Sequence, residues 1–174
     1  VVDETLTAIS NTRIADVRPV AGRAKKVVTF APTIPMSTYL VAFVIGALEP
    51  TEPVQADGVP IRVWAVPGKG HLARFALQVA AFSLRLFREY YGVPYPGDKL
   101  DLIAIPDFAF GAMENLGAIT FRETALLVDE ADATHSEQAR VAHVVAHEIA
   151  HMWFGDLVTM VWSNGLWLNE AFAT

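Results

Sequence analysis

Residues 144–155 have the sequence VVAHEIAHMWFG, an apolar run that contains the motif H-E-x-x-H. On a helix, His147 and His151 lie one turn apart on the same face, so their two imidazoles can bind one metal ion. Glu148 is offset from them by about 100°, which suits a general base acting on a water at the metal better than a third ligand. The alternative is a buried helix with two hydrogen-bonded histidines, and the correctly spaced glutamate disfavours it.

A catalytic zinc site needs a third protein ligand and an open position. Glu170 follows His151 after eighteen intervening residues, and Gly155 provides a break at which the chain can turn back. The sequence therefore predicts a site of two histidines and one glutamate. His143, one turn before His147, would fill the open position if it were a fourth ligand, so the three-ligand set is preferred.

Helical spacing predicts two long helices. Thr134 and Glu137 form a capping-box pattern, so the helix with the metal motif is expected to begin near residue 135 and to end near residue 154. Apolar residues at helical spacing over residues 71–91 predict an amphipathic helix that Gly92 ends. Its aromatic stripe is expected to face the core and consists of Phe75, Phe82 and Tyr90.

Short β-branched and apolar segments predict strands in both halves of the chain. These strands are expected at residues 6–10, 26–30, 39–45, 61–66, 100–105 and 118–121. The segment 39–45 is apolar on both faces and is expected to be a buried strand. A turn region rich in Pro and Gly at residues 49–58 is the best domain boundary. Residues 1–52 are therefore expected to end an antiparallel β domain, and residues 53–174 to belong to a second domain.

The composition excludes several classes of protein. The 174 residues carry a net charge of −6 and no basic run, so a nucleic-acid partner is not expected. The absence of cysteine excludes a disulfide scaffold and a cysteine zinc site, and it favours a cytoplasmic location. The longest apolar run is too short to span a bilayer, so no membrane segment is expected in this chain. Hydrophobic residues reach 53%, which favours a chain taken from a larger protein whose other parts cover its faces.

A glycine-flanked loop lies between the strands expected at residues 100–105 and 118–121. Gly111 and Gly117 allow the backbone to approach another group closely, and Glu114 is a charge among apolar residues. Considered alone, the loop carries a solvated glutamate. Beside a metal site, the same carboxylate can bind a substrate cation.

Three segments in combination resemble the zinc aminopeptidases of the aminopeptidase N and puromycin-sensitive aminopeptidase family, which are gluzincins. These segments are Gly111–Asn115 (GAMEN), His147–His151 (HEIAH) and Asn169–Ala173 (NEAFA). The first is similar to the exopeptidase motif of the family, and the other two are similar to its zinc motif. Residues 35–40 and 100–107 also resemble family segments. The resemblance implies an α+β fold in which residues 1–52 end an N-terminal antiparallel β-saddle domain and residues 53–174 begin a thermolysin-like catalytic domain.

The resemblance also implies roles for single residues. His147, His151 and Glu170 would bind one zinc ion per chain, with Glu148 as the general base. Glu114 would bind the free α-amino group of a peptide. The other members of this substrate-binding set would be Gly111, Ala112, Met113 and Asn115. The implied function is a zinc-dependent aminopeptidase that removes N-terminal residues from peptides through attack by a metal-activated water.

The sequence departs from the family pattern at a few positions. Trp162–Gly165 stands where the family usually carries two tryptophans and a polar pair, Met152 replaces the usual Gln, and Ala171 replaces the usual Gly. The resemblance places a transition-state-stabilising tyrosine beyond Thr174 and an amine-binding Gln before Val1. This chain alone is therefore expected to be poorly active, and the function is assigned to a parent protein whose remainder packs on it.

Two other functions stay open at this point. One is a related gluzincin with epoxide hydrolase or endopeptidase activity. The other is a non-catalytic module in which zinc only stabilises the fold. The intact Glu148 disfavours such a module, because a structural zinc needs no general base.

Overall fold

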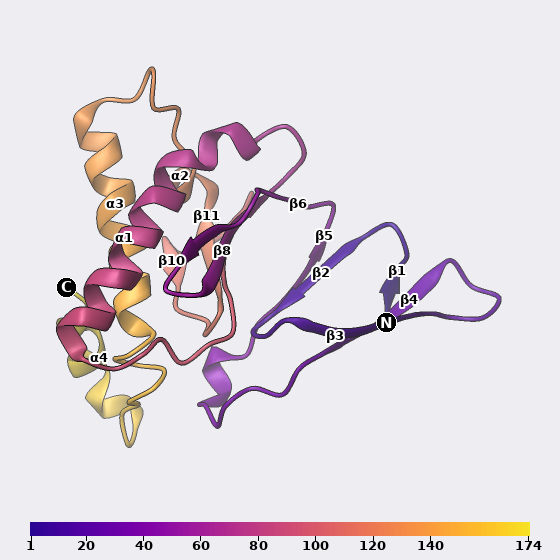
Figure 1. Cartoon of the computed structure of the whole chain (residues 1–174), viewed down its shortest axis with the longest axis horizontal. Coiled ribbons are helices and arrows are strands. Elements are labelled where there is room, and N and C mark those ends of the chain that lie inside the picture. The colour runs from indigo at the N-terminus through magenta and orange to yellow at the C-terminus, as the bar shows by residue number, and fades with distance from the viewer.

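The chain contains both strands and helices, and the predicted α+β class is confirmed. The computed structural model describes residues 1–174, with the single exception of the side chain of Ser163. Up to Gly46 the chain forms strands and one short 3-10 helix, and all α-helices follow later. Figure 1 shows the early strands on one side of a larger sheet and the long helices on its other side.

The early strands form two small antiparallel sheets. The first has the order β1-β4-β3 and consists of β1 (Val2–Asp3), β4 (Lys25–Phe30) and β3 (Ile14–Pro19). The second pairs β2 (Thr7–Ser10) with β5 (Phe43–Gly46). The predicted strands at residues 6–10 and 26–30 are thus confirmed.

The larger sheet has six strands in the order β10-β11-β9-β8-β6, with β7 also paired to β8. Its strands are β6 (Glu49–Pro50), β7 (Val54–Ala56), β8 (Val59–Ala65), β9 (Leu100–Ile105), β10 (Ala112–Met113) and β11 (Ala118–Arg122). Strands β8, β9 and β11 are parallel, whereas β6, β7 and β10 pair antiparallel with their neighbours. Five of the six residues of β9 are buried, as expected for a central parallel strand that is covered on both faces. Because β6 joins this sheet, the domain division between residues 52 and 53 stays a prediction.

Local sequence signals mark the end of α1 (Arg74–Tyr91), at Gly92, and the start of α3 (His135–His151), at Thr134. The helices are α1, α2 (Glu123–Leu126), α3 and α4 (Leu166–Ala173), with 3-10 turns at Thr38–Leu40, Gly70–Ala73 and Ser163–Gly165. The capping box of α3 is confirmed: Glu137 N–H donates to Thr134 Oγ1 (3.3 Å), and Thr134 N–H donates to Glu137 Oε2 (2.8 Å). Helix α3 ends at His151, three residues earlier than expected. No helix in the described part of the chain is long and apolar enough to cross a membrane.

The prediction that the aromatic stripe of α1 faces the core is wrong for two of its three members. Phe82 is 64% exposed and Tyr90 is 79% exposed, whereas Phe75 packs against the core. Helix α1 packs on β7, β8 and α3 through a face of small and aliphatic residues. This buried face consists of Ala76, Leu77, Ala80, Ala81, Ser83 and Leu84. Small side chains let the helix approach the sheet closely, and the large rings are left outside.

The prediction of one buried strand over residues 39–45 is also wrong. A 3-10 helix at Thr38–Leu40 comes first, β5 begins only at Phe43, and the Phe43 side chain is 74% exposed. The cause lies far away in the sequence, at Asn11. Its Nδ2 donates to Leu40 O (2.9 Å), and its Oδ1 accepts from Ala42 N–H (3.0 Å). These bonds satisfy backbone groups outside any strand ladder, so the irregular segment is stable.

The same asparagine helps to join the early strands to the larger sheet. Asn11 Nδ2 also donates to Leu116 O (2.9 Å), just before β11. Beside it, the buried Lys99 ammonium pairs with Asp101 (2.7 Å) and donates to the carbonyl oxygens of Ser10 (2.8 Å) and Gly117 (2.7 Å). The loop that precedes β11 is therefore fixed from both sides.

We expect Gly117→Ala to destabilise the chain by about 2–4 kcal/mol. Gly117 has φ +70°, and a Cβ there would overlap the backbone carbonyl of Asn11. Gly22 is the matched control, because it has the same φ of +70° but nothing within 4 Å of the added Cβ. Gly22→Ala should therefore cost only the left-handed strain of about 1 kcal/mol, and overpacking should add about 1–3 kcal/mol at Gly117. Urea unfolding of both variants measures the difference, and equal losses would contradict this contact.

Candidate metal centre

Two helices and one loop bring the predicted site residues together. His147, Glu148 and His151 lie in the last turns of α3, Glu170 lies on α4, and Glu114 follows β10. Helix α4 returns to α3 after the turn at Gly155, whose φ is +130°. The Phe154 and Phe172 rings then stack with centroids 4.7 Å apart, which holds α4 against the end of α3.

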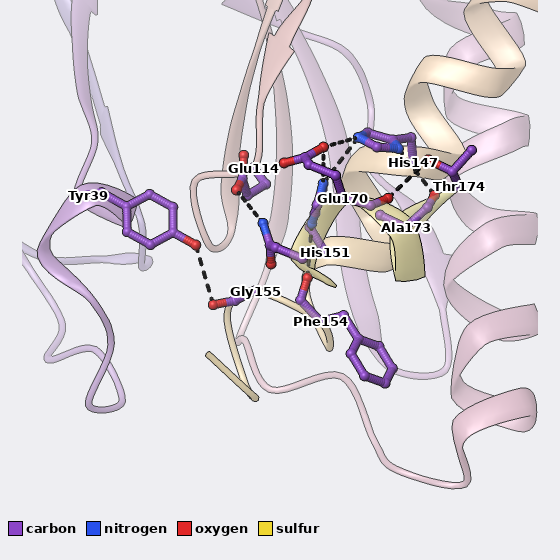
Figure 2. A network of polar contacts seen from close by, with 10 residues as sticks. Tyr39, Glu114, His147, His151, Phe154, Gly155, Glu170, Ala173 and Thr174 are labelled. Atoms are coloured by element: carbon purple, nitrogen blue, oxygen red, sulfur yellow. Dashed lines mark hydrogen bonds and ion pairs between the residues drawn. The ribbon is translucent and has the colours of Figure 1, made fainter. Parts of the chain in front are cut away.

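The three predicted metal ligands face one another (Figure 2). His147 Nε2 lies 3.1 Å from His151 Nε2, and Glu170 Oε2 lies 3.3 Å and 3.6 Å from these two nitrogens. Donor atoms of a tetrahedral zinc site, each about 2.0–2.1 Å from the ion, are about 3.3 Å apart. The spacing therefore fits a single zinc ion. His143 is not part of this group, and its ring centroid lies 6.3 Å from that of His147.

Backbone carbonyls orient both imidazoles. His147 Nδ1 lies 3.1 Å from Ala173 O, and His151 Nδ1 lies 2.9 Å from Phe154 O. With a proton on each Nδ1, the two Nε2 atoms are left as acceptors that point toward Glu170. Burial, followed by the neighbouring His151, lowers the pKa of His147, and this favours the neutral form that binds metals.

Two further carboxylates lie next to this group, and both are buried. One oxygen each of Glu114 and Glu148 and one ring nitrogen of His151 lie within 4.8 Å of one another. Burial, followed by the Glu114 and Glu170 carboxylates, raises the pKa of Glu148 to about 8. Glu148 Oε2 has no hydrogen-bond partner among the described residues. This oxygen is therefore free to interact with a bound molecule.

The site as a whole brings together four carboxyl groups without a basic partner. In the described part of the chain, no Lys or Arg forms an ion pair with Glu114, Glu148, Asp156 or Glu170. Buried carboxylates without a partner are costly, and a cation that enters the site favours their ionised form. The donor set and its charge therefore fit a bound metal ion.

The other members of the predicted substrate-binding set lie along the edge of the larger sheet. Ala112 and Met113 form β10, the last strand in the sheet order, and Gly111 O accepts from Arg122 N–H (2.9 Å). The Asn115 side chain is used inside the protein: Nδ2 donates to Leu40 O (3.3 Å), and Oδ1 accepts from Thr120 Oγ1 (3.1 Å). Asn115 thus braces the loop that carries Glu114.

Three residues near the site have no assigned role in the sequence-based prediction. Asn169 is buried, and its Nδ2 donates to Glu114 Oε1 (3.3 Å). Asp156 is buried with both oxygens unpartnered among the described residues, and burial, followed by Glu114 and Glu148, raises its pKa to about 9. The hydroxyl of Tyr39 donates to Gly155 O (3.5 Å) and reaches the site from the segment before β5. Only Asn169 has a signal in the sequence, because it precedes the predicted ligand Glu170 on the same helix.

Comparison with known proteins gives a consistent result. Residues 75–174 match the model of the peptidase family M1 domain. The chain is 53% identical to Aminopeptidase M1 of Arabidopsis thaliana over 97% of this chain and 19% of that protein. It is 47% identical to the puromycin-sensitive aminopeptidase of Caenorhabditis elegans over 99% of this chain and 18% of that protein. It is 53% identical to the probable aminopeptidase 2 of Sulfurisphaera tokodaii over 99% of this chain and 22% of that protein.

The chain thus spans about a fifth of the length of the curated relatives it matches. The family match begins in α1 and covers both helices of the candidate metal centre. The similarity to the relatives extends over nearly all of the chain, including the early strands. On this basis the chain belongs to peptidase family M1, a family of metallopeptidases.

Proposed function

We propose that the natural full-length protein is a zinc-dependent aminopeptidase that removes N-terminal residues from peptides. One observation carries the proposal: the buried Glu114 carboxylate lies beside the metal-ligand group, with Glu148 and His151 atoms within 4.8 Å. A buried, unpaired carboxylate at this place suits the ammonium group of a peptide N-terminus. The names of the relatives described above support the same activity.

His147, His151 and Glu170 hold the zinc ion in this proposal. The bound ion would supply a Lewis acid that polarises the scissile carbonyl and lowers the pKa of water. Glu148 uses its unpartnered Oε2 to accept a proton from the attacking water, and then gives the proton to the departing amine. Burial, followed by the Glu114 and Glu170 carboxylates, raises the pKa of Glu148 to about 8, and a bound cation would lower this pKa toward the range in which the group can both accept and return a proton near neutral pH.

Glu114 binds the free α-amino group and so restricts cleavage to the first peptide bond. The rest of the proposed substrate-binding set comes from the edge strand β10 and the residues around it. An edge strand offers backbone N–H and C=O groups to an extended peptide, which is the role that we assign to Gly111, Ala112 and Met113. Asn115 contributes by holding the loop in place.

The proposal also covers the domain organisation of the chain. We assign residues 1–52 to the end of an N-terminal β domain and residues 53–174 to the start of the catalytic domain, with the rest of a longer protein packed on them. The epoxide hydrolase, endopeptidase and non-catalytic alternatives are not favoured, because the relatives reported above are named as aminopeptidases. The cytoplasmic location expected from the absence of cysteine stays a prediction.

We expect His147→Ala to abolish zinc binding. The wild-type protein should retain about one zinc per chain after dialysis, and the variant should retain almost none, because a single imidazole and a carboxylate hold zinc poorly. His143→Ala is the matched control, since this exposed histidine lies one turn earlier on α3, outside the ligand group. Elemental analysis measures both. Zinc retained in His147→Ala, or lost in His143→Ala, would refute the ligand set.

We expect Glu148→Gln to lower kcat on an aminoacyl anilide by about 10²–10⁴-fold, because general acid–base catalysis is lost. The zinc content should stay at the wild-type level, since Glu148 is not a ligand in this proposal. Glu89→Gln, an exposed change on α1, should leave both quantities unchanged. Wild-type turnover in Glu148→Gln would exclude its role as the base.

The proposed amine recognition makes a separate prediction about substrates. N-acetylation of leucine 4-nitroanilide should lower kcat/KM of the wild-type protein by about 10²-fold or more, because the buried Glu114 charge then faces a neutral group. In Glu114→Gln the preference for the free amine should fall to within about tenfold. Equal rates on the two substrates in the wild-type protein would instead favour an endopeptidase.

A further inference from the structure

Two neighbouring residues of α4 point at two different parts of the site. Glu170 Oε2 lies 3.3 Å from His147 Nε2, within the metal-ligand group. Asn169, one residue earlier, donates from Nδ2 to Glu114 Oε1 at 3.3 Å. Successive helical residues are rotated by about 100°, so a single turn of α4 reaches both groups. Figure 2 shows Glu170 directed at His147 and His151, with Glu114 on its other side.

Asn169 is held firmly enough to fix another side chain. It is 6% exposed, and its Oδ1 lies so close to Gly155 that a Cβ there would be 2.5 Å away. The Gly155 φ of +130° also disfavours any other residue at this position. The turn between α3 and α4 therefore leaves a space that the Asn169 amide fills.

The hydrogen bond from Asn169 orients the Glu114 carboxylate but does not neutralise it. Among the described residues, the Glu114 carboxylate accepts one hydrogen bond, the one from Asn169, and takes part in no ion pair. An amide donor is neutral, so it orients the carboxylate without cancelling the charge that a substrate ammonium needs. A Lys or Arg at this place would neutralise Glu114 and compete with the substrate.

We propose that Asn169 is a positioning residue for exopeptidase specificity, which holds the Glu114 carboxylate at a fixed place relative to the metal ligands. Helix α4 then links the amine-binding group to the third ligand through two adjacent residues. This inference rests on the proposed function and deepens it, since it names the residue that sets the distance between N-terminus recognition and bond cleavage.

The test compares Asn169→Ala with Asn169→Leu in the natural full-length protein. Alanine removes the donor and leaves space, whereas leucine removes the donor but keeps a similar volume, so packing and hydrogen bonding are separated. We expect both variants to raise KM for leucine 4-nitroanilide by about tenfold or more, because the hydrogen bond to a charged group is lost. Slow hydrolysis of the N-acetylated substrate should be unchanged, and zinc content should stay at the wild-type level.

Three controls make the result specific. Asn164→Ala, an exposed asparagine near α4, should leave all of these values unchanged. In a Glu114→Ala background, Asn169→Ala should add less than about a twofold effect, since the group that it positions is absent. In a Glu148→Gln background, calorimetric titration with leucinamide should show binding that Asn169→Ala weakens by about tenfold, which is a readout without turnover.

Four other outcomes would overturn the inference, and each of them points to a different cause. Wild-type KM in both Asn169 variants would overturn it while leaving the aminopeptidase proposal intact. Loss of zinc in these variants would overturn it too, because Asn169 would then act on Glu170. A full effect of Asn169→Ala in the Glu114→Ala background would show that the residue acts elsewhere. A wild-type protein that does not distinguish free from acetylated substrate would overturn both proposals together.

Discussion

The candidate site depends on keeping carboxyl groups close together, most of them buried, without a basic partner. Burial, followed by Glu114 and Glu170, raises the pKa of Glu148 to about 8, and burial, followed by Glu114 and Glu148, raises the pKa of Asp156 to about 9. The described side chains provide no Lys or Arg partner for this group. The folded chain therefore holds these groups together at a cost in stability. Cations that bind from outside the chain reduce that cost, and the proposed function brings two of them, a zinc ion and a substrate ammonium.

The scaffold can bear this cost because Glu148 and Glu170 project from helices that are anchored elsewhere. The N-terminus of α3 is fixed by its capping box, and Val145 and Ile149 are fully buried in the core next to the site. Helix α4 is only eight residues long, too short to be stable alone, and depends on the stacked rings of Phe154 and Phe172. Packing on one face of a helix thus determines the distances between charges on the other face.

The correct predictions from sequence are those that rest on short-range signals. The capping box, the glycine that ends α1 and the strand at residues 100–105 each depend on residues within a few positions. The wrong predictions depended on partners far away in the chain. Segment 39–45 is shaped by Asn11, and Phe82 and Tyr90 are exposed because the opposite face of α1 packs on α3, β7 and β8. The periodicity of a single segment does not show which distant residues will contact that segment.

The same distinction between short-range signals and contacts of distant residues applies to the candidate site. The grouping of His147 and His151 follows from helical spacing, because four residues place them on one face. The contact of Asn169 with Glu114 joins residues 55 apart in sequence, and Tyr39 reaches Gly155 across 116 residues, so neither follows from spacing. Both contacts involve segments that meet at the turn between α3 and α4. The glycine at that turn therefore does more than end a helix, since its missing side chain leaves the space in which Asn169 lies against Glu114.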